Sequence, residues 1–284
     1  MKRKILLSVA MAMIYFIASA QVLDYKDGGN LALFQKEIDE KTSFRTDEQV
    51  VRICAYYHVP DRLLPQLRQY VGMRERQCVA QEYIFPDSLK RRMLNKLAIE
   101  EIYQDSIDML LIPFNRDRIS GENISYALYM SEMIGLEREQ YDFLMKEALD
   151  MARRIRKNRM LNVWDEEMDV LKDILSKEQL KRMFYKKNHA IVNKLLQDGW
   201  MRLLEKGLTE QLDSATELKQ ARFYYNESEK IKAIYRYKPS IRKKCLNEIG
   251  KRKPTMIKML DALDKEARLA KKEEETGVTQ EFIW

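Results

Sequence analysis

The chain has few residues that turn or interrupt a backbone. Its 284 residues include nine glycines and six prolines, whereas residues that favour helices, such as leucine, lysine, glutamate and methionine, are abundant. A sheet needs frequent turns rich in glycine, proline and asparagine, and the sequence has no alternating strand pattern of any length. The sequence therefore predicts an all-α fold, an elongated antiparallel bundle or a set of helical hairpins that follows a cleavable signal peptide.

The motifs of the common catalytic and cofactor-binding sites are also absent. There is no Gly-x-Ser-x-Gly motif, no P-loop and no dinucleotide-binding fingerprint. The only two histidines, His58 and His189, occur without a His-x-x-x-His or Cys-x-x-Cys spacing, and a zinc site needs three or four such ligands. We interpret them as helix-end or surface residues. We therefore expect no cofactor, no bound metal and no enzymatic activity.

Only three cysteines are present, Cys54, Cys78 and Cys245, so they cannot all pair within the chain. If straight antiparallel helices meet at Pro60, Cys54 lies about 9 Å and Cys78 about 27 Å from the turn, at about 1.5 Å per residue. A disulfide requires Cα atoms within about 7 Å of each other. We expect mostly buried free thiols, although a bent chain would permit the Cys54–Cys78 bond, and Cys245 is open to pairing with another chain.

Residues 1–20 have the pattern of a secretion signal. Three cations are followed by the apolar run Ile5–Ile17 and by an Ala-Ser-Ala site for a signal peptidase. The alternative, a retained membrane anchor, is disfavoured because the run falls short of the roughly 20 residues that span a bilayer. We expect the mature chain to begin at Gln21, to have no transmembrane segment, and to be periplasmic in a Gram-negative bacterium or secreted.

The charge of the chain is less informative than its total of +7 indicates. Three of these excess positive charges lie in the predicted signal, which leaves about +4 on the mature chain. Both signs alternate along nearly every segment, which is typical of solvated helix faces. We therefore expect no nucleic-acid partner.

Helix-start signals and apolar ladders divide the chain. Capping boxes begin at Thr46 and Ser176, the second opening a long helix that ends at Gly207, and Thr209 is expected to cap a helix of nearly 30 residues. Two predicted helices have clear apolar ladders: Leu94, Ala98, Ile102 and Met109; and Tyr141, Leu144, Ala148, Met151 and Ile155.

The loop 113–122 is the clearest internal boundary, because it joins a proline, mixed charges and a Ser-Gly turn. We expect a signal peptide at 1–20, an N-terminal helical region at 21–112, a C-terminal long-helix region at 123–272 and a flexible tail at 273–284.

Two short stretches, 136–140 and 175–179, each have a leucine followed by a glutamine four positions later at the start of a helix. They resemble the twin L-T-x-x-Q motifs of the Spy/CpxP family of periplasmic helical proteins, over residues of about 123–206. Neither copy has the threonine, because Glu137 replaces it in the first and Ser176 in the second.

The resemblance implies a cradle-like chaperone or stress-signalling modulator without an enzymatic centre, with a concave apolar and basic surface. No residue role transfers beyond the motif itself, whose physical content is helix capping. The motif residues are Leu136, Gln140, Leu175, Ser176 and Gln179.

Two basic clusters flank the predicted helix that starts at Trp164, and antiparallel packing would bring them together. Such a patch suits an acidic client, lipid phosphates or another envelope polymer. The first cluster is Arg153, Arg154, Arg156, Lys157 and Arg159, and the second is Lys181, Arg182, Lys186 and Lys187.

Other polar and aromatic groups have less specific interpretations. The aromatic stretches 223–225 and 235–237 are expected to be half-buried between helices rather than to bind a ligand. The apolar tip 282–284 either folds back onto the bundle or is captured by a carboxylate-binding domain of an envelope protease.

Two sets of carboxylates share a helix face and are expected to form solvated ion pairs rather than the paired catalytic acids of a glycosidase. They are Glu101, Asp105 and Asp108, and Glu166, Asp169 and Asp173.

The function that these features favour is non-enzymatic binding of a protein partner or unfolded client by an exported helical protein, which is chaperone-like or stress-modulating. Apolar side chains would supply affinity, and flanking cations would retain acidic segments. A structural or assembly subunit of a cell-envelope complex, with homo-oligomers, is the alternative, and an envelope-polymer hydrolase is the third.

Overall fold

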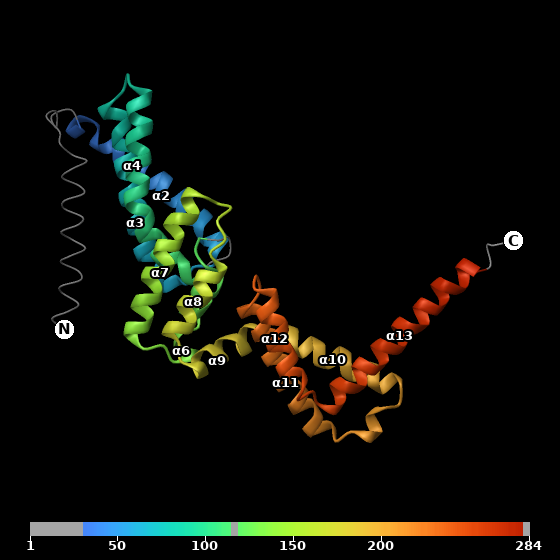
Figure 1. The fold of residues 1–284 in the computed structure, drawn as a ribbon. Helices are drawn as coiled ribbons and strands as arrows, with labels where there is room; N and C mark the ends of the chain where they lie inside the picture. Colours follow the sequence, from blue (N-terminus) through green and yellow to red (C-terminus); the bar gives the residue numbers. More distant parts are fainter. Residues whose placement is uncertain (1–30, 115–118, 281–284) are drawn as a thin grey trace. The chain divides into compact units, whose positions relative to one another are not determined.

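The computed structural model describes residues 31–114 and 119–280, with side chains described as far as 272 (Figure 1). The predicted signal peptide and the apolar tip 282–284 lie outside the described residues. Every regular element of the described ranges is a helix, and none is a strand, so the predicted all-α fold is confirmed. No helix in these ranges is long and apolar enough to cross a membrane.

Contacts divide the chain into two units. Of the described residues, unit 1 comprises 31–114 and 119–129 together with Tyr141–Leu161, and unit 2 comprises Met130–Gln140 together with 162–280. The described residues on both sides of the predicted boundary at 113–122 belong to unit 1. Ser120 links this part of the chain to the later part of unit 1, because its hydroxyl donates a hydrogen bond to the Ala148 carbonyl at 2.7 Å.

Unit 1 is built on three consecutive helices, of which α2 packs on α3 and α3 packs on α4 (Figure 1). Its elements are η1 (Leu31–Phe34), α2 (Gln35–Tyr57), η2 (Asp61–Leu63), α3 (Leu64–Ile84), α4 (Leu89–Leu111), η3 (Ile112–Phe114), α5 (Glu122–Tyr129) and most of α7 (Arg138–Lys157). One buried cluster of its core contains Val50, Val59, Leu67, Val71, Ile107 and Leu111.

The predicted capping box at Thr46 is wrong, because Thr46 lies in the middle of α2. Its side chain is buried at 5% exposure, and a Cβ atom placed on Gly72 of α3 would lie 3.7 Å from it. Close packing of α2 on α3 at this point has outweighed the local capping preference of threonine. The helix α2 ends at Tyr57, and His58 follows it in a left-handed conformation, with φ of 49°.

The apolar ladder that the sequence shows on α4 faces solvent. Leu94, Ala98, Ile102 and Met109 are all exposed. The buried ladder of α4 lies on another side of the helix and contains Ile99, Tyr103, Ile107 and Leu111. On α7 the predicted ladder is buried except at the half-buried Tyr141, because Leu144, Ala148, Met151 and Ile155 are between 0% and 7% exposed.

Unit 2 contains α6 (Ser131–Ile134), α8 (Trp164–Ile174), α9 (Lys177–Lys187), α10 (His189–Glu205), η4 (Thr209–Gln211), α11 (Ser214–Ile234), α12 (Pro239–Gly250) and α13 (Thr255–Gln280). Its core forms where α10, α11 and α13 meet. The buried residues of this core are Val192, Leu196, Leu203, Ala221, Met256, Ile257 and Leu260.

Two helix boundaries of unit 2 differ from the prediction. The long helix after Ser176 is interrupted at the buried residue Asn188, which separates α9 from α10. Thr209 begins only a short 3₁₀ turn, and α11 starts after Asp213, whose carboxylate accepts a hydrogen bond from the Thr216 hydroxyl at 2.6 Å. The predicted turn at Gly207 is confirmed, because its φ of +67° is left-handed.

The three cysteines are free thiols, but the expectation that most of them are buried is wrong. Cys78 is buried in unit 1, whereas Cys54 and Cys245 are half-buried. Burial, together with the nearby negative charge of Glu75, raises the pKa of the Cys78 thiol to about 11.

Candidate functional site

The two motif glutamines, Gln140 and Gln179, form a reciprocal pair within unit 2. The side-chain amide of Gln140 donates to Oε1 of Gln179 at 3.1 Å, and that of Gln179 donates to Oε1 of Gln140 at 2.8 Å. Each Oε1 atom also accepts from the backbone three residues earlier, from Glu137 at 3.0 Å and from Ser176 at 2.9 Å. The predicted capping role is confirmed, and the structure adds a link between the two caps that sequence spacing does not contain.

The outer hydrogen bonds of the two glutamines follow the same plan. Gln140 donates to the carbonyl of Ile174 at 2.8 Å, and Gln179 donates to the carbonyl of Gly135 at 2.7 Å. Each acceptor is the residue immediately before the leucine of the opposite motif. The missing threonines do not disturb this arrangement, because the amides alone make the link. We call the pair the glutamine clasp.

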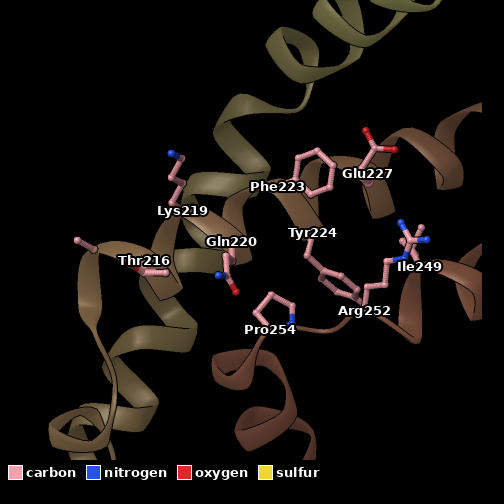
Figure 2. A pocket seen from close by; sticks show the side chains of 10 residues that line it. Thr216, Lys219, Gln220, Phe223, Tyr224, Glu227, Ile249, Arg252 and Pro254 are labelled. Carbon is pink, nitrogen blue, oxygen red and sulfur yellow. The ribbon is translucent and has the colours of Figure 1, made fainter.

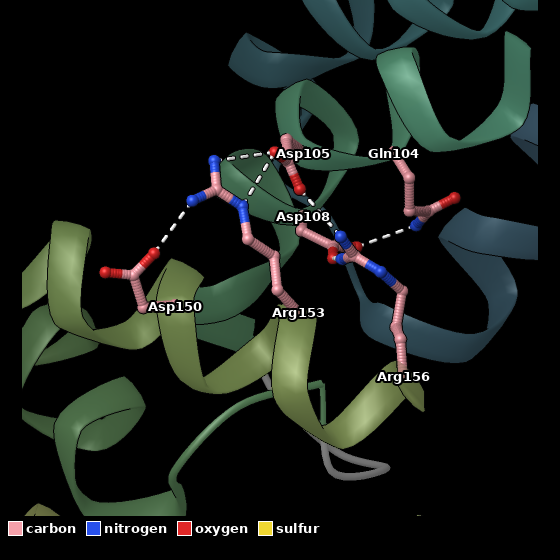
Figure 3. Close-up of polar contacts among 6 residues, drawn as sticks. All are labelled: Gln104, Asp105, Asp108, Asp150, Arg153 and Arg156. Carbon is pink, nitrogen blue, oxygen red and sulfur yellow. Dashed lines mark hydrogen bonds and ion pairs between the residues drawn. The ribbon is translucent and has the colours of Figure 1, made fainter. Parts of the chain in front are cut away.

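The first predicted basic cluster lies in unit 1, and two of its members are engaged within the protein (Figure 3). Arg153 donates to Asp105 at 2.8 and 2.9 Å and to Asp150 at 2.8 Å. Arg156 donates to Asp105 at 2.7 Å and also to Asp108. These two arginines therefore hold α7 against α4, which leaves less of the cluster for a partner.

The environments of the two aspartates differ. Burial alone would raise the pKa of Asp105, but hydrogen bonds from Arg153 and Arg156 lower it below its ordinary value. Burial raises the pKa of Asp108, and its contacts with Gln104 and Arg156 only partly oppose this shift. Both carboxylates lie one turn apart on α4 and share Arg156, which favours an ion-pair network over a pair of catalytic acids across a cleft.

A cavity of about 590 Å³ adjoins this network in unit 1 and includes Arg156 and Arg159 in its wall. Its charges are largely balanced, because Arg74 pairs with Glu75 at 2.8 Å and Arg156 pairs with the two aspartates. The remaining charged residue of the wall is Arg159, which is exposed. The remaining members of the cluster, Arg154 and Lys157, are exposed at the end of α7.

The second predicted basic cluster lies on α9 in unit 2, where two lysines sit on aromatic rings. The Lys181 ammonium is 5.5 Å from the centre of the Tyr185 ring and 6.0 Å from that of Phe223. The Lys187 ammonium is 5.9 Å from the Trp164 ring. Arg182 and Lys186 are exposed.

A groove of about 860 Å³ follows one face of α11, next to the second basic cluster (Figure 2). It is closed on its other side by the end of α12 and the segment that leads into α13. Glu217 fixes this arrangement, because its carboxylate accepts from the backbone N–H of Met256 at 2.9 Å, in the first turn of α13. The lining residues are Ala215, Thr216, Lys219, Gln220, Phe223, Tyr224, Glu227, Ile249, Arg252 and Pro254.

Aromatic side chains supply much of the apolar surface of the groove. Phe223 is 57% exposed, and the Tyr224 ring points toward Pro254 and Arg252 (Figure 2). The expectation of half-buried aromatic residues between helices is confirmed for Tyr224 and Tyr225, whereas Phe223 is exposed. The packing of α12 beside α11 decides which of these aromatic residues line the groove and which lie in the core. The sequence pattern alone therefore did not identify the groove-lining residues.

The charge of the groove is positive and uncompensated. Its single carboxylate, Glu227, already accepts from the Tyr185 hydroxyl at 2.7 Å and from Lys230 at 2.7 and 2.9 Å. Lys219 and Arg252 have no carboxylate partner in the described part of the chain. The groove can therefore accept a segment that combines apolar or aromatic side chains with a carboxylate.

The remaining polar candidates have structural explanations. His189 is exposed at the start of α10 and lies 3.1 Å from the side chain of Asn193. Asp169 pairs with Lys172 and Lys238. Within residues 31–114 and 119–272, no group of three or more potential metal ligands is present.

Comparison of the chain with protein-family models, with curated proteins and with solved structures finds no match.

Proposed function

We propose that this chain is an exported, non-enzymatic helical protein that binds apolar protein segments carrying acidic residues, in the manner of a periplasmic chaperone-like or stress-modulating factor. The observation that carries the proposal is the groove on α11, which joins Phe223 and Tyr224 to the unpaired cations Lys219 and Arg252. Lys181 of the neighbouring basic cluster lies 6.0 Å from the centre of the Phe223 ring and pairs with Glu178 at 4.0 Å.

The expected mechanism divides affinity and selectivity between two kinds of contact. A buried leucine or phenylalanine side chain contributes about 1.5–3 kcal/mol, and an exposed ion pair contributes about 1 kcal/mol or less. A segment that buries two or three apolar side chains therefore binds weakly once the cost of association is subtracted. Weak binding suits a protein that must release its client.

The glutamine clasp supports kinship with the Spy/CpxP family, because Gln140 and Gln179 have equivalent roles in the two motif copies. Kinship in turn favours a chaperone-like role over the alternatives of an envelope assembly subunit and an envelope-polymer hydrolase.

The test is light-scattering aggregation of a reduced, unfolding client protein with and without the chain from Gln21 onward. Suppression at near-stoichiometric amounts is expected, and Phe223→Ala or the double variant Lys219→Glu/Arg252→Glu is expected to weaken it. Because these side chains are solvent-accessible, the variants should fold normally, which circular dichroism checks.

The matched controls change an exposed apolar residue and two exposed cations away from the groove, on α13. They are Leu269→Ala, whose side chain is 51% exposed, and Lys258→Glu/Lys265→Glu, which alters the net charge by the same amount. Loss of suppression in the controls as well as in the groove variants would contradict a groove-specific mechanism. Absence of suppression even with the chain in excess would contradict the proposed function.

A further inference from the structure

The end of α11, the whole of α12 and the turn after it form the most basic segment of the chain. Residues 230–253 contain ten cations and one carboxylate, which is a net charge of +9. The whole chain has a net charge of +7, so the remaining residues together have a net charge of −2. The excess positive charge of the protein is therefore concentrated in this segment of unit 2.

Half of these ten cations are neutralised by carboxylates. They are Lys230 with Glu227 at 2.7 Å, Lys232 with Glu229 at 2.6 Å, Lys238 with Asp169 at 3.7 Å, Lys251 with Glu248 at 2.8 Å and Lys253 with Asp261 at 2.5 Å. The other five make no ion pair within the described part of the chain, and they are Arg236, Arg242, Lys243, Lys244 and Arg252. We call the first four of these the α12 cations.

The carboxylates of the adjoining helices are engaged elsewhere or do not reach the α12 cations. α12 packs on α11, whose carboxylates Glu217, Glu227 and Glu229 accept from the Met256 backbone or pair with lysines. The carboxylate of α12 itself, Glu248, is the partner of Lys251. On α8, Asp169 pairs with Lys172 and Lys238, and no described carboxylate of that helix pairs with Arg236.

The two arginines among the α12 cations are held in place without a carboxylate. The guanidinium of Arg236 lies 4.7 Å from the centre of the Trp164 ring and 5.6 Å from that of Tyr237. Arg242 donates a hydrogen bond to the backbone carbonyl of Arg236 at 3.1 Å. The stability of α12 does not explain its cations, because positive charge near the start of a helix is disfavoured by the helix dipole.

These features favour an acidic protein segment over other partners of negative charge. Single-stranded nucleic acid stacks its bases on free aromatic rings, but the Trp164 and Tyr237 rings already contact Arg236. A membrane interface needs a continuous apolar face, and Ile241 is the one large apolar side chain that is exposed among the described residues of α12. A second copy of this surface would be repelled, because the segment has ten cations for one carboxylate.

The α12 cations also adjoin the groove on α11. Ile249 at the end of α12 and Arg252 in the following turn belong to the wall of the groove. At about 1.5 Å per residue along a helix, Lys244 lies about 7.5 Å before Ile249 and Arg242 about 10 Å before it. An extended segment of six residues spans about 20 Å. A client segment that places an apolar side chain in the groove is therefore long enough to place its flanking carboxylates on α12.

We propose that the α12 cations extend the groove into a two-part site for a client segment in which apolar residues are followed by a run of aspartates or glutamates. This inference rests on the proposed function and specifies the class of client. The apolar residues pack on Phe223 and Tyr224, and the acidic run lies along α12. Each exposed ion pair increases affinity by about 1.4-fold to fivefold, so selectivity comes from several pairs that act together.

The test is fluorescence anisotropy of two dye-labelled peptides with the chain from Gln21 onward. One peptide has two phenylalanines followed by six glutamates, and the other has six glutamines in place of the glutamates. We expect the glutamate peptide to bind about tenfold more tightly at low salt, and this ratio to fall at high salt. Lys243→Gln/Lys244→Gln should lower the ratio by about threefold or more without changing the affinity for the glutamine peptide. Both lysines are exposed, so this variant should fold normally.

The matched control Lys258→Gln/Lys265→Gln removes two exposed cations from α13 and should keep the ratio of the parent chain. Phe223→Ala should weaken the binding of both peptides alike and also keep the ratio. Equal binding of the two peptides, or a ratio that Lys243→Gln/Lys244→Gln leaves unchanged, would overturn this inference alone. Absence of binding by both peptides would overturn the proposed function as well.

Competition with the bound glutamate peptide tests the class of partner. Polyglutamate is expected to displace the peptide most effectively at a given concentration of charge. Stronger displacement by DNA or by phosphatidylglycerol vesicles would overturn the assignment to a protein segment. So would a concentration-dependent dimer, measured by light scattering, that Lys243→Gln/Lys244→Gln abolishes.

Discussion

Removal of the glutamine clasp should destabilise unit 2 in a strongly non-additive way. Gln179→Ala removes both amide–amide hydrogen bonds, the contact to the Ser176 backbone N–H and the contact to the Gly135 carbonyl. A typical net contribution is about 1 kcal/mol per hydrogen bond, and these side chains are only partly buried. We therefore expect Gln179→Ala, and likewise Gln140→Ala, to lower the free energy of unfolding by about 1–3 kcal/mol.

The double variant separates the clasp from ordinary capping. Each single change already breaks both amide–amide bonds, so the second change removes only its own capping contacts. The coupling energy of the double-mutant cycle is therefore expected to be about 1–2 kcal/mol. Additive effects within about 0.3 kcal/mol would refute the reciprocal pairing.

Tryptophan fluorescence during urea unfolding is the suitable assay. Trp164 and Trp200 belong to unit 2, so their emission reports on the unit that contains the clasp. The matched control is Gln220→Ala, at an exposed glutamine of α11, which should change stability by about 0.5 kcal/mol or less. A similar loss in this control would show that the assay does not isolate the clasp.

Three further predictions concern unit 1. Because Arg153 and Arg156 hold the pKa of Asp105 below its ordinary value of 3.8, the charged carboxylate contributes stability above that pH, and this stability is lost as the pH falls through the lowered pKa. Asp105→Asn should lower the free energy of unfolding of unit 1 by about 1 kcal/mol at pH 7 and should reduce the loss of stability in acid. Hydrogen exchange of α4 measures both effects. An unchanged acid response would contradict the ion-pair assignment. The Cys78 thiol should react with maleimide more slowly than the other two thiols, because it is buried and its pKa is raised to about 11. Mass spectrometry of peptides identifies which thiols have reacted. Equal rates would contradict the burial of Cys78. Thr46→Val should be neutral or stabilising in thermal unfolding, because the buried Thr46 hydroxyl has no hydrogen-bond partner, and a loss above about 1 kcal/mol would indicate a bond that the structure lacks.

Some of the candidate site was accessible from sequence and some was not. The motif glutamines were found from their spacing, because a capping box is a contact between residues three apart. The basic clusters were also found, but the spacing did not indicate that Arg153 and Arg156 are bound to aspartates 48 and 51 residues away. The groove was missed, because its wall joins residues of α11 to Arg252 and Pro254, which only the turn after α12 brings beside it.

The sequence by itself determined the helical class, the left-handed turn at Gly207, the capping box at Ser176 and most of the buried ladder of α7. These features depend on contacts within about four residues, or on a left-handed turn that glycine adopts readily. Only the tertiary structure decided that Thr46 lies inside a helix and which face of α4 is buried. Those outcomes depend on which neighbouring helix covers each face, and apolar residues on a covered and an uncovered face look alike in the sequence.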